Sequence, residues 1–109
     1  MDVPGFALVT GAGQGIGQAV AQTFARDGAA GVAICDINEA GLLKVKAIIE
    51  EQQEKLGRPC QVEVFQLDVT NEEQVEQVVT GAAQKFGRLD YCVNAVSSPP
   101  SPQNLFLVG

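Results

Sequence analysis

The glycine-rich stretch TGAGQGIG, Thr10–Gly17, decides the fold of this chain. Before it, the apolar and β-branched run Phe6–Thr10 predicts a strand buried on both faces. After it, apolar residues recur at helical spacing from Gly15 to a stop signal at Gly28, which predicts a helix. A phosphate group can approach the backbone of such a turn closely because glycine has no Cβ. The stretch therefore indicates a strand, a phosphate-binding turn, and a helix whose N-terminus faces the anion.

Apolar runs and helical stripes continue to alternate along the chain. Further strands are predicted at Gly31–Cys35, Val62–Leu67 and Leu89–Asn94, and further helices at Glu39–Leu56 and from about Thr70 to Phe86. Strands and helices that alternate with short connections form parallel sheets with right-handed crossovers. We therefore expect an α/β fold over residues 1–96. It is half of a doubly wound, Rossmann-like sheet, with about four parallel strands, flanking helices, and the third strand near an edge.

The pattern changes after Val96. Three of the five prolines fall within Ser97–Pro102, and proline fits neither a helix interior nor a central strand. The last apolar run, Leu105–Val108, is compatible with a strand, a docked tail or an exposed end. We expect residues 97–109 to form a poorly ordered, proline-rich tail, because chain termini are usually loose unless other contacts hold them.

Composition and charge limit the partners of this chain. It has 109 residues, 46% of them hydrophobic, which allows one domain at most. A net charge of −6 argues against nucleic acid and anionic membranes as partners. No apolar run approaches the roughly 20 residues that span a bilayer, and no secretory signal is visible, so we expect a cytoplasmic protein. There is no histidine, and we expect no metal site and reduced thiols at Cys35, Cys60 and Cys92.

An acidic residue follows the second predicted strand. Asp36 lies 25 positions after Gly11, where a carboxylate can accept hydrogen bonds from the ribose hydroxyls of a dinucleotide. Its charge would repel a 2′-phosphate, and neither Gln14 nor Ile37 supplies a cation to receive one. The sequence therefore favours NAD over NADP. The alternative interpretation of Asp36 is a solvated helix cap before Asn38.

Two further polar positions close predicted strands at the edge of the sheet where ligands bind. Asp68, followed by Val69, is placed to accept a hydrogen bond from an adenine amino group. The alternative is that Asp68 helps to cap the helix beginning near Thr70. Asn94 closes the fourth strand, where it can bridge strand ends or face the cofactor, or simply be one of the polar residues that commonly close strands.

Four motifs together resemble the N-terminal half of a short-chain dehydrogenase/reductase: TGAGQGIG, the Asp36 that closes GVAIC, the LDVT of Leu67–Thr70, and the GRLDYCVNA of Gly87–Ala95. The resemblance covers about residues 6 to 95. It implies phosphate contacts at Gly11, Gln14 and the backbone of Gly15, Ile16 and Gly17. It also implies ribose contact at Asp36, adenine contact at Asp68 and Val69, and a structural or ribose-proximal role for Asn94.

The chain departs from the family pattern directly after Asn94. The family usually continues with Asn-Ala-Gly or Ala-Ala-Gly, whereas this chain reads Ala95-Val96-Ser97. The family's catalytic serine and Tyr-x-x-x-Lys pair are not matched either, since Tyr91 is the one tyrosine and Ala95 stands four positions later. We expect Tyr91 to be a packing residue. The family's oligomerisation helices are also expected to be absent.

We therefore expect the NAD(P)-binding portion of an oxidoreductase, truncated before the catalytic residues and inactive alone. In a full-length parent, the resemblance implies hydride transfer between NAD and an alcohol or carbonyl substrate. One alternative is a non-catalytic NAD-binding module with a regulatory or interaction role. Another is an α/β fold that binds a methyl donor, against which only the wider set of motifs argues. No Gly-Lys-Ser/Thr follows the glycines, which excludes a kinase-type phosphate loop.

Overall fold

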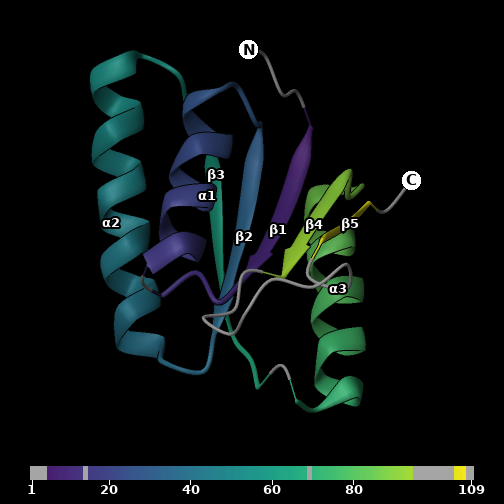
Figure 1. Ribbon diagram of the computed structural model, residues 1–109. Coiled ribbons are helices and arrows are strands. Elements are labelled where there is room, and N and C mark those ends of the chain that lie inside the picture. The colour runs from purple at the N-terminus through teal and green to yellow at the C-terminus, as the bar shows by residue number, and fades with distance from the viewer. Residues whose placement is uncertain (1–4, 14, 69, 95–104, 108–109) are drawn as a thin grey trace.

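The computed structural model describes residues 5–13, 15–68, 70–94 and 105–107. Strands and helices alternate from Phe6 to Asn94, as the sequence predicts (Figure 1). In chain order they are β1 (Phe6–Thr10), α1 (Gly15–Arg26), β2 (Gly31–Asp36), α2 (Glu39–Leu56), β3 (Gln61–Gln66), α3 (Glu72–Phe86), β4 (Tyr91–Asn94) and β5 (Leu105–Leu107).

One sheet carries all of these strands, in the order β3-β2-β1-β4-β5. The pairs β1–β2, β1–β4 and β2–β3 are parallel, which confirms the predicted half of a doubly wound sheet with β3 near an edge. Thr10, the last residue of β1, pairs with Cys35 on one side and Asn94 on the other. Because the strands are parallel, their carboxyl ends meet at one edge of the sheet, and the predicted site residues follow those ends.

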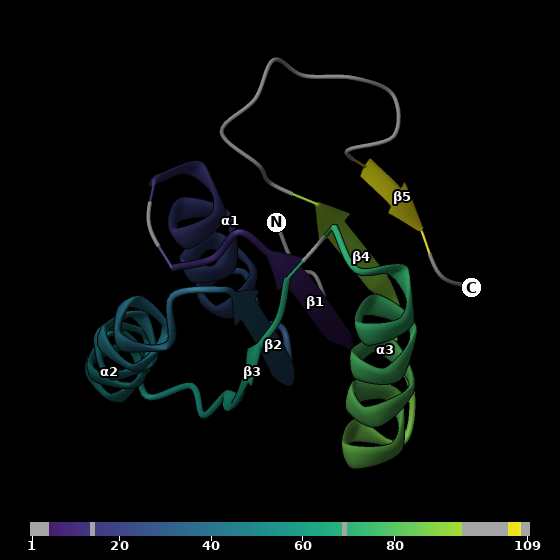
Figure 2. The same ribbon diagram turned by 90° about the horizontal axis from the view of Figure 1, so that it is seen from below.

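Helices cover both faces of the sheet: α1 and α2 lie on one face and α3 on the other (Figure 2). The strands alternate their side chains between two buried clusters. In β1, Val9 belongs to the cluster under α1 and α2, and Leu8 belongs to the cluster under α3. Both side chains are almost fully buried. The apolar sequence of β1 therefore reflects burial on both faces, as expected for a central parallel strand.

A short strand near the end of the chain adds to the sheet. Leu105–Leu107 forms β5 and pairs antiparallel with β4, with Leu105 opposite Val93 and Leu107 opposite Tyr91. The expectation of a poorly ordered tail over residues 97–109 stays a prediction. The four predicted parallel strands agree with the structure, and β5 adds a fifth, antiparallel strand beside β4. The physical reason is that β4 otherwise presents unpaired backbone groups along its outer edge. The other residues of 97–109 lie outside the described residues, and the boundary at Val96 stays a prediction.

The cysteines are free thiols, and two of them are buried in the sheet. Burial raises the pKa of the Cys35 thiol far above its usual range, and it raises those of Cys60 and Cys92 to about 11. These thiols are therefore protonated at neutral pH, which makes them poor nucleophiles. Within the described part of the chain, no helix is long and apolar enough to cross a membrane.

Candidate functional site

The glycine-rich turn leaves β1 and is fixed first to the neighbouring strand. Gly11 has a φ of +67°, which glycine adopts without the steric cost that a Cβ would bring. The Ala12 N–H then donates to the Cys35 carbonyl oxygen at 3.0 Å, and the Ala12 side chain is fully buried. The turn is thus held against the end of β2 before it reaches α1. Gln14 lies outside the described residues.

The glycine at position 17 allows α1 to begin close to the end of β1. A Cβ at Gly17 would lie 2.0 Å from the Gly11 carbonyl oxygen, so no other residue fits without moving the backbone. The first N–H groups of a helix have no intrahelical partner, and here they belong to Gly15, Ile16 and Gly17. The Ile16 side chain is 70% exposed beside them. The turn therefore presents unpartnered helix amides and an exposed apolar side chain at the same place, an arrangement suited to a phosphate-bearing ligand.

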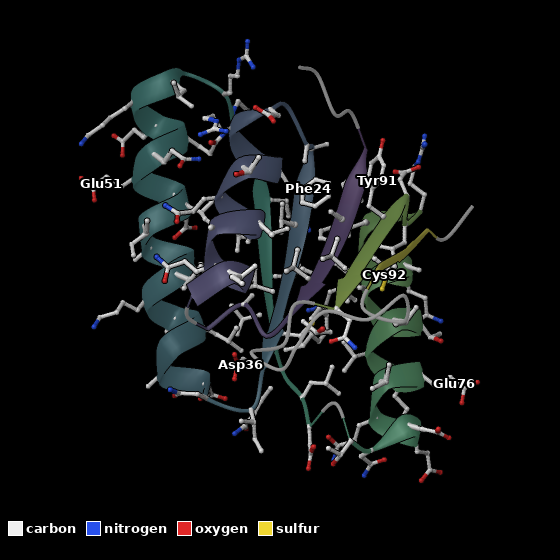
Figure 3. All side chains as sticks on the ribbon, in the orientation of Figure 1. Phe24, Asp36, Glu51, Glu76, Tyr91 and Cys92 are labelled. Atoms are coloured by element: carbon white, nitrogen blue, oxygen red, sulfur yellow. The ribbon has the colours of Figure 1, made fainter. Side chains whose placement is uncertain are left out.

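Asp36 lies directly beside this turn, as Figure 3 shows. Its Oδ2 accepts a hydrogen bond from the Gly13 N–H at 2.9 Å, and its Oδ1 accepts one from the Asn38 N–H at 3.0 Å. Asp36 is not the cap of α2, because the N-cap is Asn38, whose side chain accepts from the Gly41 N–H. Each carboxylate oxygen retains a second lone pair. The carboxylate can therefore accept ribose hydroxyls while it holds the turn.

Asp68 makes local contacts after β3. Its Oδ1 accepts from the Thr70 N–H at 2.9 Å and from the Thr70 hydroxyl at 2.6 Å. These two hydrogen bonds lower the pKa of the Asp68 carboxyl below its usual value, because they stabilise the charged form. The N-cap of α3 is Asn71, whose side chain accepts from the Gln74 N–H. The adenine contact predicted for Asp68 and Val69 is untested, and Val69 lies outside the described residues.

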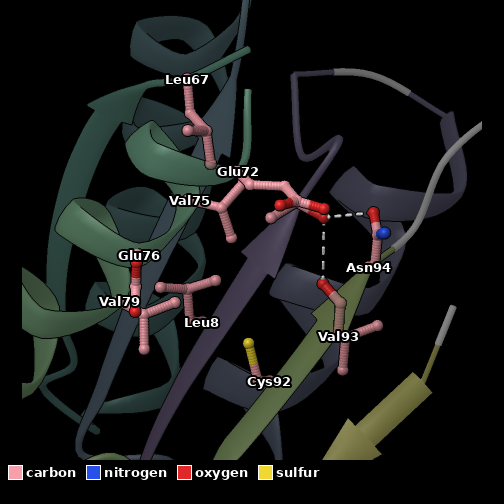
Figure 4. A pocket seen from close by; sticks show the side chains of 10 residues that line it. Leu8, Leu67, Glu72, Val75, Glu76, Val79, Cys92, Val93 and Asn94 are labelled. Carbon is pink, nitrogen blue, oxygen red and sulfur yellow. Dashed lines mark hydrogen bonds between the residues drawn. The ribbon is translucent and has the colours of Figure 1, made fainter. Parts of the chain in front are cut away.

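Asn94 bridges the ends of two strands, one of the roles considered for it. The Thr10 hydroxyl donates to Asn94 Oδ1 at 2.7 Å and has a longer contact of 3.4 Å with the Val93 carbonyl oxygen, shown by the dashed lines in Figure 4. Thr10 is only 5% exposed, and the sequence reasoning did not recognise it as a site residue. Its position directly before the glycine turn was the available clue. This hydrogen bond directs the amide oxygen of Asn94 toward β1.

A cavity of about 350 Å³ opens between α3 and the carboxyl ends of β1 and β4 (Figure 4). Thr10 and Asn94 belong to its lining, so the cavity is continuous with the candidate site. Most of the other lining side chains are apolar, and α3 adds two carboxylates. Besides Thr10 and Asn94, the lining residues are Leu8, Leu67, Glu72, Val75, Glu76, Val79, Cys92 and Val93. The sequence predicted the apolar stripe of α3 but not that this cavity would lie beside it.

Tyr91 lies at the other end of β4. It begins the strand, whereas Asn94 ends it at the candidate site. Its ring lies 5.5 Å from the ring of Phe24 in α1, between the two centroids, so Tyr91 packs against a helix as predicted. Among the described residues, no group of three or more side chains is placed to hold a metal ion.

Comparison with known proteins identifies the family to which this chain belongs. The family model of the short chain dehydrogenase matches residues 5–106, so this chain belongs to that family. It is 44% identical over 96 residues to the short-chain dehydrogenase anuF of Penicillium roqueforti (strain FM164), a match that covers 87% of this chain and 34% of that protein. The chain spans about a third of the length of the curated relatives it matches.

Solved structures lead to the same class. NAD⁺-bound xylitol dehydrogenase superposes with a TM-score of 0.74 at 32% identity, over 85% of this chain and 33% of that one. The C-domain of a bacterial malonyl-CoA reductase with NADP superposes with a TM-score of 0.79 at 30% identity, over 88% and 15%. The chain is the NAD(P)-binding portion of a short-chain dehydrogenase fold. These matches favour the oxidoreductase interpretation over a non-catalytic module.

Proposed function

We propose that this chain binds NAD in preference to NADP, as the cofactor-binding portion of an enzyme that transfers hydride between the nicotinamide and an alcohol or carbonyl substrate. The observation that carries the proposal is the Asp36 carboxylate, which lies at the end of β2 and is hydrogen-bonded to Gly13 of the turn. A ribose held at this turn would meet a negative charge. That charge accepts hydroxyl hydrogens and repels a 2′-phosphate.

The other predicted contacts belong to the same proposal. The phosphates would contact Gly11, Gln14 and the first N–H groups of α1 at Gly15, Ile16 and Gly17. Asp68 and Val69 would contact the adenine, and Asn94 would have a structural or ribose-proximal role. The positions of the described residues along one edge of the sheet support this assignment.

Calorimetric titration of NAD and NADP into the 109-residue chain tests the preference. We expect NAD to bind at least about tenfold more tightly than NADP, a difference of about 1.4 kcal/mol. Asp36→Asn should narrow this ratio because it removes the repelling charge, and high salt should narrow it in the unmodified chain by screening. Asp68→Asn is the matched control, since adenine is common to both cofactors and the ratio should not change. Equal affinity for the two cofactors would contradict the proposal.

The cellular setting and the partners are also proposed. We infer a cytoplasmic location, which the three free thiols support, and no nucleic-acid partner, which the net charge of −6 supports.

A further inference from the structure

A closed ring of contacts connects the glycine turn to the start of α2. The Gly13 N–H donates to one oxygen of Asp36, and the Asn38 N–H donates to the other. The Asn38 side chain in turn accepts from the Gly41 N–H at 3.2 Å. Gly41 completes the ring by close packing, because a Cβ placed on it would lie 2.8 Å from the Gly13 carbonyl oxygen and 3.4 Å from the Gly13 Cα.

The ring holds the part of the turn that follows Ala12. Ala12 is already held by the Cys35 carbonyl oxygen of that strand. Gly13, the next residue, is held through its N–H by Asp36 and is limited at its carbonyl oxygen by Gly41. The N–H and the carbonyl oxygen of Gly13 are therefore both restrained, one by the last residue of β2 and the other by the first turn of α2. Gly13 lies two residues from Gly11 and from Gly15, so its position sets where the phosphate-binding amides lie.

We propose that Asn38 and Gly41 are positioning residues for the dinucleotide. They act through Gly13: Asn38 keeps the first turn of α2 in place, and Gly41 lets that turn approach the Gly13 carbonyl oxygen. The inference rests on the proposed function for its ligand. It adds that the start of α2, which carries none of the predicted contacts, controls how tightly the cofactor binds.

Two glycine substitutions separate this role from general effects on helices. Gly41→Ala and Gly81→Ala each replace a helical glycine, and intrinsic helix propensity favours both changes. At Gly81 the new Cβ would meet nothing closer than a Phe65 ring carbon at 3.9 Å, whereas at Gly41 it would force the Gly13 carbonyl oxygen to move. We expect the NAD dissociation constant to rise about tenfold in Gly41→Ala and to change less than about twofold in Gly81→Ala.

The two asparagine caps provide a second matched pair. Asn38 and Asn71 each accept a backbone N–H at 3.2 Å at the start of a helix, so replacement by alanine should lower the melting temperature similarly. Only Asn38→Ala should also weaken NAD binding. Asn38→Ser, which restores a capping oxygen, should recover most of the lost affinity. A purely structural role would not distinguish the two caps in this way.

The experiment combines NAD titration with amide hydrogen exchange at Gly13 in the ligand-free, full 109-residue chain. The proposal is overturned if Gly41→Ala and Gly81→Ala bind NAD equally well. If the unmodified chain binds no NAD, the proposed function fails. The restraint of Gly13 by the ring of contacts is then tested by amide hydrogen exchange at Gly13 alone. Faster Gly13 exchange in Gly41→Ala and Asn38→Ala than in their controls then supports the ring, and equal exchange overturns it.

Discussion

The regions that join β2 to α2 and β3 to α3 have similar local sequences, but their aspartates make different contacts. An aspartate lies at the end of β2 and another shortly after β3, and each is followed by an asparagine that caps the next helix. The capping residues Asn38 and Asn71 have similar backbone angles, with φ and ψ of −91° and 93° in one and −99° and 99° in the other. From the local sequence alone, the two aspartates would be expected to have the same role.

The aspartates differ in what their carboxylates reach. Asp36 accepts a hydrogen bond from Gly13, which is 23 positions away in the chain, and Asp68 accepts both of its hydrogen bonds from Thr70. The reason is the order of strands. Since β2 lies beside β1, the turn that leaves β1 passes within reach of Asp36, whereas Asp68 follows β3, at the edge of the described sheet. The place in the sheet, rather than the local sequence, separates the two roles.

The largest expected effect comes from moving the glycine turn to which Asp36 is hydrogen-bonded. Gly17→Ala would place a Cβ 2.0 Å from the Gly11 carbonyl oxygen, so β1 and α1 must separate. We expect a loss of roughly 3 kcal/mol in the free energy of unfolding, measured by urea denaturation, together with loss of NAD binding. Gly81→Ala is the control and should leave both unchanged or slightly improve stability. Unchanged stability and NAD binding in Gly17→Ala would contradict the close approach of Gly17 to the Gly11 carbonyl oxygen.

Exchanging each aspartate for alanine tests the comparison directly. Asp36→Ala leaves the N–H groups of Gly13 and Asn38 without their acceptor, which should lower the free energy of unfolding by about 1 to 3 kcal/mol. Asp68→Ala affects only the turn with Thr70 and should cost less. Thermal unfolding of the ligand-free chain measures both. Equal losses in the two variants would mean that the contact across the sheet adds nothing to the local one.

Much of the fold could be predicted because its elements are marked locally. The runs at Phe6–Thr10 and Gly31–Cys35 are apolar and end at glycine or aspartate, so their place as central strands was evident. The bounds of α2 at Glu39 and Leu56 also agree with the structure, since Gly57 adopts a left-handed conformation that ends the helix. The position of Asp36 beside the turn followed from the same pattern.

The remaining features depend on contacts between distant segments. The hydrogen bond from Thr10 to Asn94 exists because β1 and β4 pair in a particular register. Gly41 gave no signal, because a glycine within a helix reveals its purpose only when the neighbouring turn is in place. Pairing of Leu105–Leu107 with β4 likewise depends on a strand edge that the local sequence does not show.

The smallest expected effect is at Asp68, where the local hydrogen bonds can be measured by titration. Its folded pKa lies below the ordinary value of 3.8 because the Thr70 hydroxyl and N–H stabilise the carboxylate. The stability from this group is therefore present above pH 3.8 and is lost as the pH falls through the folded pKa. By NMR titration, Thr70→Ala should raise the Asp68 pKa toward 3.8 and Thr70→Ser should leave it low. Alanine keeps the backbone N–H that donates to Asp68 Oδ1, so an unchanged pKa in Thr70→Ala would show that the Thr70 hydroxyl does not stabilise the Asp68 carboxylate.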